Sequence, residues 1–142
     1  MIYTKKTKIA LKLCFEAHKH QTDKSGIPYV FHPFHVAEEM KSEETTVVAL
    51  LHDLVEDTEY DLEDISDMGF DKTITDAIAL MTHEEGIDYF DYIRKIKEDP
   101  VARAVKLEDL KHNCDLTRLD YIDDEALKRR EKYLKALALL EE

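Results

Sequence analysis

The chain has 142 residues, with 32 Asp and Glu against 20 Lys and Arg, so its formal net charge is −12. This length suits one domain, and the 44% hydrophobic content is enough for one sizeable core. The acidic balance excludes non-specific binding of nucleic acid, which needs clustered Lys and Arg, and only three Gly and three Pro argue against a sandwich of many short strands.

Helical patterns begin near the N-terminus. Residues 4–20 carry apolar side chains at three- and four-residue intervals with Lys between them, which predicts an amphipathic helix. Residues 24–28, with the sequence KSGIP, interrupt it. We expect His32, which precedes a proline, just outside the next helix in an extended conformation, with Pro33 in the first helical turn. That helix should run to about Met40.

The middle of the chain carries three helix-capping signals. Ser42, followed by two Glu residues, is expected to cap a helix that continues through Val55. Asp61 should cap a short helix that ends near Gly69. Asp71 should cap the next helix, which is expected to end at Gly86. The buried stripe of that helix is predicted to be Ile74, Ala77, Ile78 and Met81.

The last part of the chain is also predicted to be helical. One helix is expected around Tyr89 to Ile96, and the pair Asp99 and Pro100 opens another that continues through Asp109. A final helix is expected from about Asp124. Its predicted buried stripe is Leu127, Tyr133, Leu134, Leu137 and Leu140. Because there is no linker or repeat, residues 1–142 are expected to form one all-α domain of about seven or eight helices.

No segment predicts export or membrane insertion. No apolar run is longer than Val47 to Leu51, which is far too short to cross a bilayer, and the Lys-rich start is not followed by the apolar stretch of a signal peptide. Cys14 and Cys114 lie in segments with a helical pattern and are interpreted as reduced core thiols. We therefore expect a cytoplasmic protein.

The segment His52–Asp57 carries most of the chemistry. At about 100° per residue, the imidazole of His52 and the carboxylates of Asp53, Glu56 and Asp57 fall within one helical arc of about 140°. Carboxylates this close raise one another's pKa unless a cation lies among them, so we infer a bound metal ion. Ala49 lies in the same arc, and its small side chain is expected to leave space for an approaching ligand.

His52 and Asp53 supply only half of a set of four ligands. His32, fixed by the proline after it, and Asp109 on a later helix are candidates for the other half. Two acids and two imidazoles suit manganese, iron or zinc better than calcium. The alternative is a surface acid and a solvated imidazole, which the acidic arc disfavours.

Other polar side chains give weaker signals. On the helix of Asp109, Lys106 lies one turn before it and Asn113 one turn after it on the same face. His18 and His20 diverge by about 200° on a helix and cannot share one metal ion, although one of them could support the site from behind the ligands. The remaining histidines are interpreted as surface or core-edge residues, namely His35, His83 and His112.

Three sequence motifs resemble the hydrolase domain of the RelA/SpoT-type HD-domain proteins, which remove the 3′-pyrophosphate from the alarmone (p)ppGpp. They are AHKHQTDKSGIPYVFHP, ALLHDLVEDT and VKLEDLKHN, and the similarity extends from about Leu11 to Leu119. The resemblance implies an all-α HD-domain helical bundle with a (p)ppGpp 3′-pyrophosphohydrolase activity. It implies a small-molecule nucleotide as partner, with neither nucleic acid nor a membrane. Since 142 residues leave no room for a synthetase domain, hydrolysis alone is expected.

The resemblance also assigns roles to individual residues. It implies one divalent ion, manganese ahead of iron, zinc or cobalt, and catalytic roles for Glu56 and Asp57 in handling the attacking water and the proton transfers. The positions that match the family's metal ligands are His32, His52, Asp53 and Asp109. The positions that match its nucleotide pocket or belong to the same motifs are Lys24, Ser25, Tyr29 and Asn113.

Two positions differ from the family pattern. Asp23 and Leu110 stand where family members usually carry Arg, and an acid cannot stack a planar cation on guanine. This difference motivates a second hypothesis, an HD-domain phosphohydrolase for another nucleotide or phosphate ester. A third hypothesis is a non-catalytic nucleotide-sensing module, which the presence of both Glu56 and Asp57 disfavours.

Overall fold

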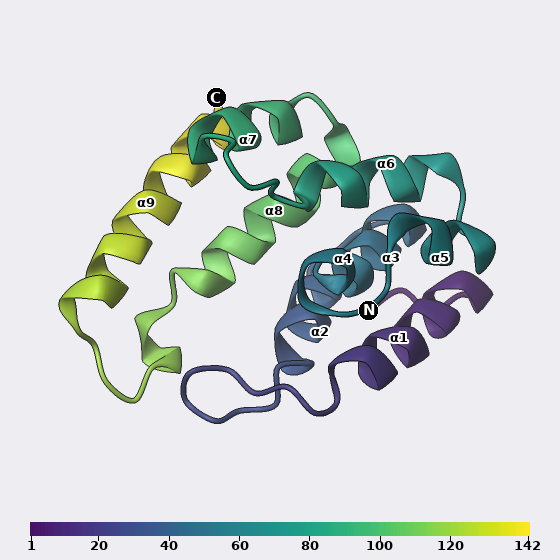
Figure 1. The fold of residues 1–142 in the computed structure, drawn as a ribbon, viewed down its shortest axis with the longest axis horizontal. Coiled ribbons are helices and arrows are strands. Elements are labelled where there is room, and N and C mark those ends of the chain that lie inside the picture. The colour runs from purple at the N-terminus through teal and green to yellow at the C-terminus, as the bar shows by residue number, and fades with distance from the viewer.

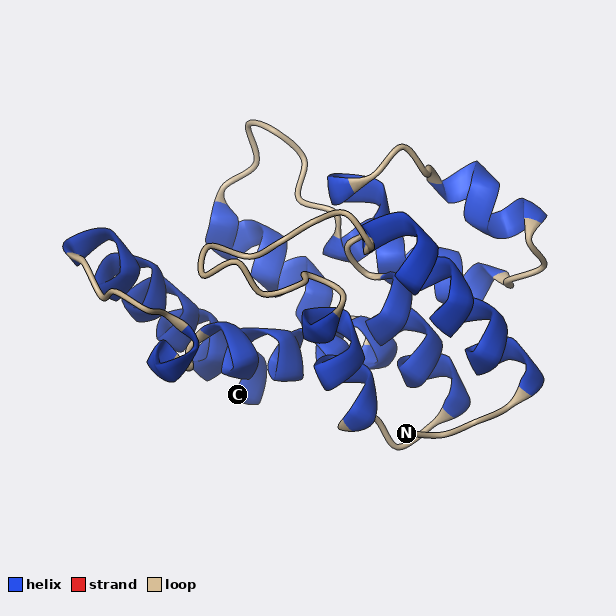
Figure 2. Cartoon of the chain, turned by 90° about the horizontal axis from the view of Figure 1, so that it is seen from below, coloured by secondary structure: helices blue, strands red, loops and turns tan.

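Helices make up nearly all of the regular structure in the computed structural model, which describes residues 1–142 (Figures 1 and 2). The bounds are α1 Lys5–His18, α2 Phe31–Glu38, α3 Glu43–Leu51, α4 Leu54–Asp57, α5 Leu62–Asp67, α6 Lys72–Met81, α7 Tyr89–Lys97, α8 Pro100–Asn113, the 3₁₀-helix η1 Leu116–Arg118 and α9 Asp124–Glu141. The all-α prediction is confirmed. There are nine α-helices rather than seven or eight, because the helix expected through Val55 is divided into α3 and α4.

The predicted helix starts are confirmed by their hydrogen bonds. Each of the four capping side chains accepts from a backbone N–H in the first turn of its helix, and these residues are Ser42, Asp61, Asp71 and Asp99. Pro100 occupies the first turn of α8, where its missing N–H leaves no helical bond unmade. Local residue chemistry therefore sets where most of these helices begin.

The core is built around α3. Every residue from Thr46 to Leu51 is buried, and α3 contacts α1, α2, α6 and α8. On the other side of α8, α9 lies alongside α7 and α8 (Figure 1). As a result α8 separates the central helix from the last helix of the chain. No helix is both long enough and apolar enough to span a bilayer.

The expectation for His32 is wrong. The residue is not extended outside the helix but lies in the first turn of α2, and its backbone N–H donates to the Tyr29 carbonyl at 2.9 Å. Pro33 fits here because first-turn N–H groups have no acceptor within the helix. The preference of pre-proline residues for extended backbone is overridden by this bond and by the burial of both side chains.

Two further expectations differ from the structure. The helix expected through Val55 is interrupted at His52 and Asp53, between α3 and α4, although both residues keep right-handed helical backbone angles. Helix α6 ends at Met81 rather than at Gly86, since the following Thr82 has extended backbone, and Gly86 turns the connection to α7 with a φ of 86°.

The predicted stripe of α9 is only partly correct. Leu127 and Leu134 are 49% and 43% exposed. Helix α9 instead buries the small side chains of Ala126 and Ala136 together with Leu140. At about 100° per residue, the two leucines lie roughly 120° to 140° from the centre of that stripe, on the exposed side of the helix. Small residues at the contact allow α9 to approach its neighbours closely.

Candidate metal centre

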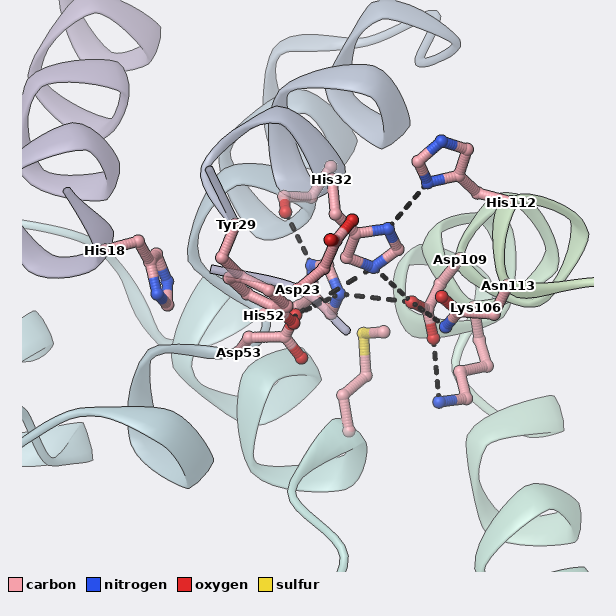
Figure 3. A network of polar contacts seen from close by, with 12 residues as sticks. His18, Asp23, Tyr29, His32, His52, Asp53, Lys106, Asp109, His112 and Asn113 are labelled. Carbon is pink, nitrogen blue, oxygen red and sulfur yellow. Dashed lines mark hydrogen bonds and ion pairs between the residues drawn. The ribbon is translucent and has the colours of Figure 1, made fainter. Parts of the chain in front are cut away.

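Side chains from three separate segments converge beside α8. His32 from α2, His52 just after α3 and Asp109 from α8 each offer one ligand atom, and these atoms lie within 4.8 Å of one another (Figure 3). The Nε2 atoms of His32 and His52 are 2.8 and 3.5 Å from Oδ1 of Asp109. All three residues are buried, with exposed fractions of 4%, 2% and 4%.

Asp53 completes the group from the edge. Its Oδ2 is 3.2 Å from Nε2 of His52 and 4.0 Å from Nε2 of His32. The side chain is less buried than the other three, so it faces the open side of the cluster. The structure thus brings together all four residues that the sequence nominated.

The orientation of His52 fits a metal ligand. Its Nδ1 lies 2.6 Å from the Ala49 carbonyl oxygen, which can only accept, so Nδ1 carries the hydrogen and donates. Its Nε2 is buried and has no hydrogen-bond partner. A buried ring nitrogen without a hydrogen-bond partner, beside two carboxylates, fits a divalent cation with nitrogen and oxygen ligands. Ala49 is fully buried, so it contributes through this carbonyl and not through the open space expected from its small side chain.

The electrostatics of the cluster favour positive charge. Burial alone would raise the pKa of Asp53, but the positive charge of His52, whose Nε2 is 3.2 Å from Oδ2, outweighs it and lowers the pKa to about 2. Burial lowers the pKa of His52, yet the charge of Asp53 raises it well above its ordinary value. The negative potential of Asp53 and Asp109 would stabilise a metal cation between them in the same way.

Asp109 is held by two neighbours on its own helix. Nζ of Lys106 donates to Oδ2 at 2.9 Å, and Nδ2 of Asn113 donates to Oδ1 at 3.2 Å. Burial would raise the pKa of Asp109, but the ammonium of Lys106 and the two histidines keep it well below its usual range. The predicted grouping of these residues on one face of α8 is confirmed.

Tyr29 and His18 support the cluster from the side of α1. The Tyr29 hydroxyl donates to Oδ2 of Asp53, and burial and the charge of Asp53 raise the pKa of Tyr29. The His18 ring is buried, 5.3 Å from the Tyr29 ring. Its Nδ1 is 2.8 Å from Oε1 of Gln21. His18 is therefore the member of the His18 and His20 pair that lies behind the ligands, and His20 is exposed.

His112 is half-buried, as expected for a core-edge residue, but its contact with the cluster was not predicted from the sequence. Its Nδ1 is 2.7 Å from Nδ1 of His32, so it touches a candidate ligand directly. Burial and the charge of Arg118 lower the pKa of His112 to about 3, which keeps the ring neutral. A signal existed in the sequence, because His112 lies three residues after Asp109 on one helical face. His35 and His83 are exposed, as predicted.

Glu56 and Asp57 project from α4 as exposed acids next to this centre. Oε1 of Glu56 accepts from the backbone N–H of His83. Partial burial of its carboxyl group against neighbouring atoms raises the pKa of Glu56, and the charge of Asp53 adds to the effect. Burial and Asp53 likewise raise the pKa of Asp57. Both groups are therefore better proton acceptors than ordinary surface carboxylates.

A cavity of about 320 Å³ opens beside the cluster. It is lined by Tyr29, His32 and Asn113 together with three cationic side chains, those of Lys24, Arg118 and Arg129. Arg118 and Arg129 were not singled out from the sequence. Two carboxylates, those of Asp23 and Asp115, also line the cavity. Because cations outnumber acids here, in a chain whose net charge is −12, the cavity suits an anion better than the rest of the chain does.

Two side chains of the segment 23–25 are hydrogen-bonded within the protein: Ser25, which was predicted to belong to the nucleotide pocket, and Asp23, where the family usually carries Arg. The Ser25 hydroxyl is absent from the cavity wall, because it donates to the Arg118 carbonyl at 3.0 Å and accepts from the Asp120 N–H at 3.2 Å. Asp23, at the cavity edge, accepts through Oδ1 from the backbone N–H groups of Ser25 and Ile27. Its carboxylate therefore shapes the turn, and Arg118 lies 4.0 Å from its Oδ2.

Comparisons with known proteins show which sequences this chain resembles. A sequence model of the HD domain family matches residues 10–113. A probable GTP pyrophosphokinase of Mycobacterium leprae is 34% identical over 86% of this chain and 17% of its own length. The bifunctional (p)ppGpp synthase/hydrolase SpoT of Escherichia coli is 35% identical over 70% of this chain and 14% of its own length. The chain thus spans less than a fifth of the length of these relatives.

A solved structure shares the fold. A metazoan ortholog of SpoT, described as hydrolysing ppGpp, superposes with a TM-score of 0.78 at 23% sequence identity. The match covers 99% of this chain and 88% of that one. The arrangement of helices around the four candidate ligands is therefore one that a known protein also adopts.

Proposed function

The chain belongs to the HD domain family, and from this we propose that it is a metal-dependent pyrophosphohydrolase that removes the 3′-pyrophosphate of (p)ppGpp. The observation that carries the proposal is the buried cluster of His32, His52 and Asp109, with Asp53 at its edge. The choice of (p)ppGpp as substrate rests on the SpoT-type relatives, whose names describe hydrolysis of this nucleotide.

The four candidate ligands would hold one divalent ion, and manganese is the ion we expect. Two imidazoles and two carboxylates form a mixed nitrogen and oxygen set that suits first-row transition metals. When bound, such an ion supplies Lewis acidity at a phosphoryl oxygen and screens the negative charge of the substrate. The protein contributes the fixed orientation of the ligands, through Ala49, Lys106 and Tyr29.

Glu56 and Asp57 are the residues we assign to proton transfer. The overall reaction adds water across the bond between phosphorus and the ribose 3′ oxygen, releasing pyrophosphate and leaving a 3′ hydroxyl. Glu56 is oriented by the His83 N–H, and its raised pKa suits it to take the proton of the attacking water. Asp57 could then assist in delivering a proton to the 3′ oxygen as it leaves.

The cationic cavity is the region we assign to the rest of the nucleotide. Lys24, Arg118 and Arg129 would meet phosphate groups, and Tyr29 and Asn113 lie where the cavity joins the metal cluster. Arg is well suited to phosphate because its planar guanidinium donates two parallel hydrogen bonds. This local positive charge would bind an anionic nucleotide despite the net negative charge of the chain.

The proposal is tested by measuring both products. Purified protein is loaded with Mn²⁺ and incubated with ppGpp, and pyrophosphate, orthophosphate and guanosine nucleotides are quantified separately. We expect equal amounts of pyrophosphate and GDP, with no orthophosphate. A panel of other nucleotides and phosphate esters serves as the control for substrate choice. Failure of the metal-loaded protein to release pyrophosphate from ppGpp would remove the assignment.

A further inference from the structure

The imidazole of His112 lies next to the metal cluster without belonging to it. Its Nδ1 is 2.7 Å from Nδ1 of His32, and the two ring planes differ by 8° (Figure 3). Atoms in van der Waals contact approach only to about 3.5 Å, so a proton must lie between these two nitrogens. The contact is therefore a hydrogen bond between the rings.

The direction of this hydrogen bond depends on the other nitrogen of His32. Nε2 faces the cluster, 2.8 Å from Oδ1 of Asp109. A neutral imidazole that gives its Nε2 lone pair to a metal ion carries its hydrogen on Nδ1. In that state His32 donates and His112 accepts.

Two further contacts hold His112 in place. The ring of His35, one turn after His32 on α2, stacks on it with centroids 3.9 Å apart and planes 17° apart. Nη1 of Arg118 donates to the backbone carbonyl of His112 at 3.0 Å. The ring of His112 is therefore positioned before any ion arrives, which is how a fixed partner aids coordination.

We propose that His112 is a positioning residue for the metal centre, whose Nδ1 accepts the Nδ1–H of His32 and so keeps the Nε2 lone pair of His32 turned into the cluster. The inference rests on the metal-dependent function proposed above. It parallels His52, whose Nδ1 donates to the Ala49 carbonyl at 2.6 Å. The Nδ1 of each imidazole in the cluster then has one hydrogen-bond partner. The partner of His52 is a backbone carbonyl, whereas the partner of His32 is a side chain, which mutation can change.

Two substitutions separate the hydrogen bond from the packing of the ring. His112→Phe keeps a flat ring against His35 but has no acceptor, and His112→Asn places an amide oxygen near the former Nδ1. By titration calorimetry with Mn²⁺, we expect His112→Phe to weaken binding by about 10- to 100-fold and His112→Asn to stay within a few-fold of the unmodified protein. Equal affinity of His112→Phe and the unmodified protein, or equal weakness of both variants, would overturn the proposal.

The tautomers can also be read in the unmodified protein. With Zn²⁺ bound, a long-range ¹H–¹⁵N spectrum of the histidine rings should show hydrogen on Nδ1 of His32 and none on Nδ1 of His112. The reverse assignment would overturn the proposal even where His112→Phe fails to fold. A protein that binds neither Mn²⁺ nor Zn²⁺ would remove the metal centre itself. Normal binding by both variants would remove only the role of His112.

Discussion

The metal cluster and the cavity beside it are built in different ways. The cluster comes from α2, α8 and the end of α3, helices that pack against one another, and its histidines and Asp109 are at most 4% exposed. The cavity is lined mainly by the segments 22–29 and 113–119, with α9 adding Arg129. The difference indicates that the geometry of the proposed metal centre is fixed by packed helices, whereas the proposed nucleotide-binding region lies mainly on connecting segments that can vary.

Removing Asp109 should have the largest effect, since it breaks the cluster at its most buried acid. Asp109→Ala is expected to abolish pyrophosphate release and Mn²⁺ binding. It also leaves the ammonium of Lys106 without its carboxylate, which should cost about 3–5 kcal/mol of folding free energy. Denaturant unfolding, calorimetry with Mn²⁺ and product assays measure the three consequences.

A double variant separates instability from loss of the metal. Asp109→Ala combined with Lys106→Met removes the unpaired charge, so stability should recover while Mn²⁺ binding does not. Recovery of activity in the double variant would contradict the assignment of Asp109 as a ligand.

Glu56→Gln should have the next largest effect and should leave the cluster intact. Loss of a positioned proton acceptor typically lowers the rate by about 10²- to 10⁴-fold. Mn²⁺ affinity should be unchanged because Glu56 is not in the cluster. Glu59→Gln, an exposed acid three residues further along, is the matched control. Loss of metal binding in Glu56→Gln would show that Glu56 acts on the cluster and not on water.

The pH dependence of kcat/KM gives a second test of Glu56 as the proton acceptor. Because burial and the charge of Asp53 raise its pKa, the carboxylate accepts protons at a higher pH than an ordinary Glu, whose pKa is about 4.3. The base must be deprotonated to act, so activity should fall as pH decreases through this raised pKa. The acid limb of kcat/KM should therefore lie above pH of about 4.3, and Glu56→Gln should remove that dependence.

Arg129→Ala tests the cavity and should have a smaller effect. The guanidinium lines the cavity but no cluster residue depends on it. Loss of one charge-assisted contact of about 1.5 kcal/mol should raise KM for ppGpp roughly tenfold with little change in kcat. Lys128→Ala on the same helix, exposed and outside the cavity, is the control. A fall in kcat without a change in KM would contradict a purely binding role.

Local signals in the sequence were sufficient for most of the fold. Capping by Ser42, Asp61, Asp71 and Asp99 and the buried stripe of α6 depend on neighbours a few residues apart, so they could be predicted without tertiary information. The four ligand candidates followed from their residue types and from motifs in a recognisable order. Their convergence required the structure.

Features that depend on distant partners could not be predicted in this way. The helix expected through Val55 is interrupted at His52 and Asp53, where Tyr29 bonds to Asp53 from 24 residues away. His112 was missed because its partner His32 lies 80 residues earlier. Arg129 enters the cavity only because α9 packs against α8. In each case a tertiary contact decides the role of a side chain that looks ordinary in the sequence.

Ser25→Ala should give the smallest effect and tests how the cavity segments are joined. The hydroxyl bridges the Arg118 carbonyl and the Asp120 N–H, so its loss should cost about 0.5–1.5 kcal/mol per hydrogen bond and loosen the two segments. The amide of Asp120 should exchange hydrogen faster, and KM should rise a few-fold while kcat and Mn²⁺ affinity stay unchanged. Ser66→Ala, at an exposed position of α5, is the control. An unchanged hydrogen-exchange rate at the Asp120 amide would mean that the two segments keep their geometry without this bridge. The cavity would then be held more rigidly than its position on connecting segments implies.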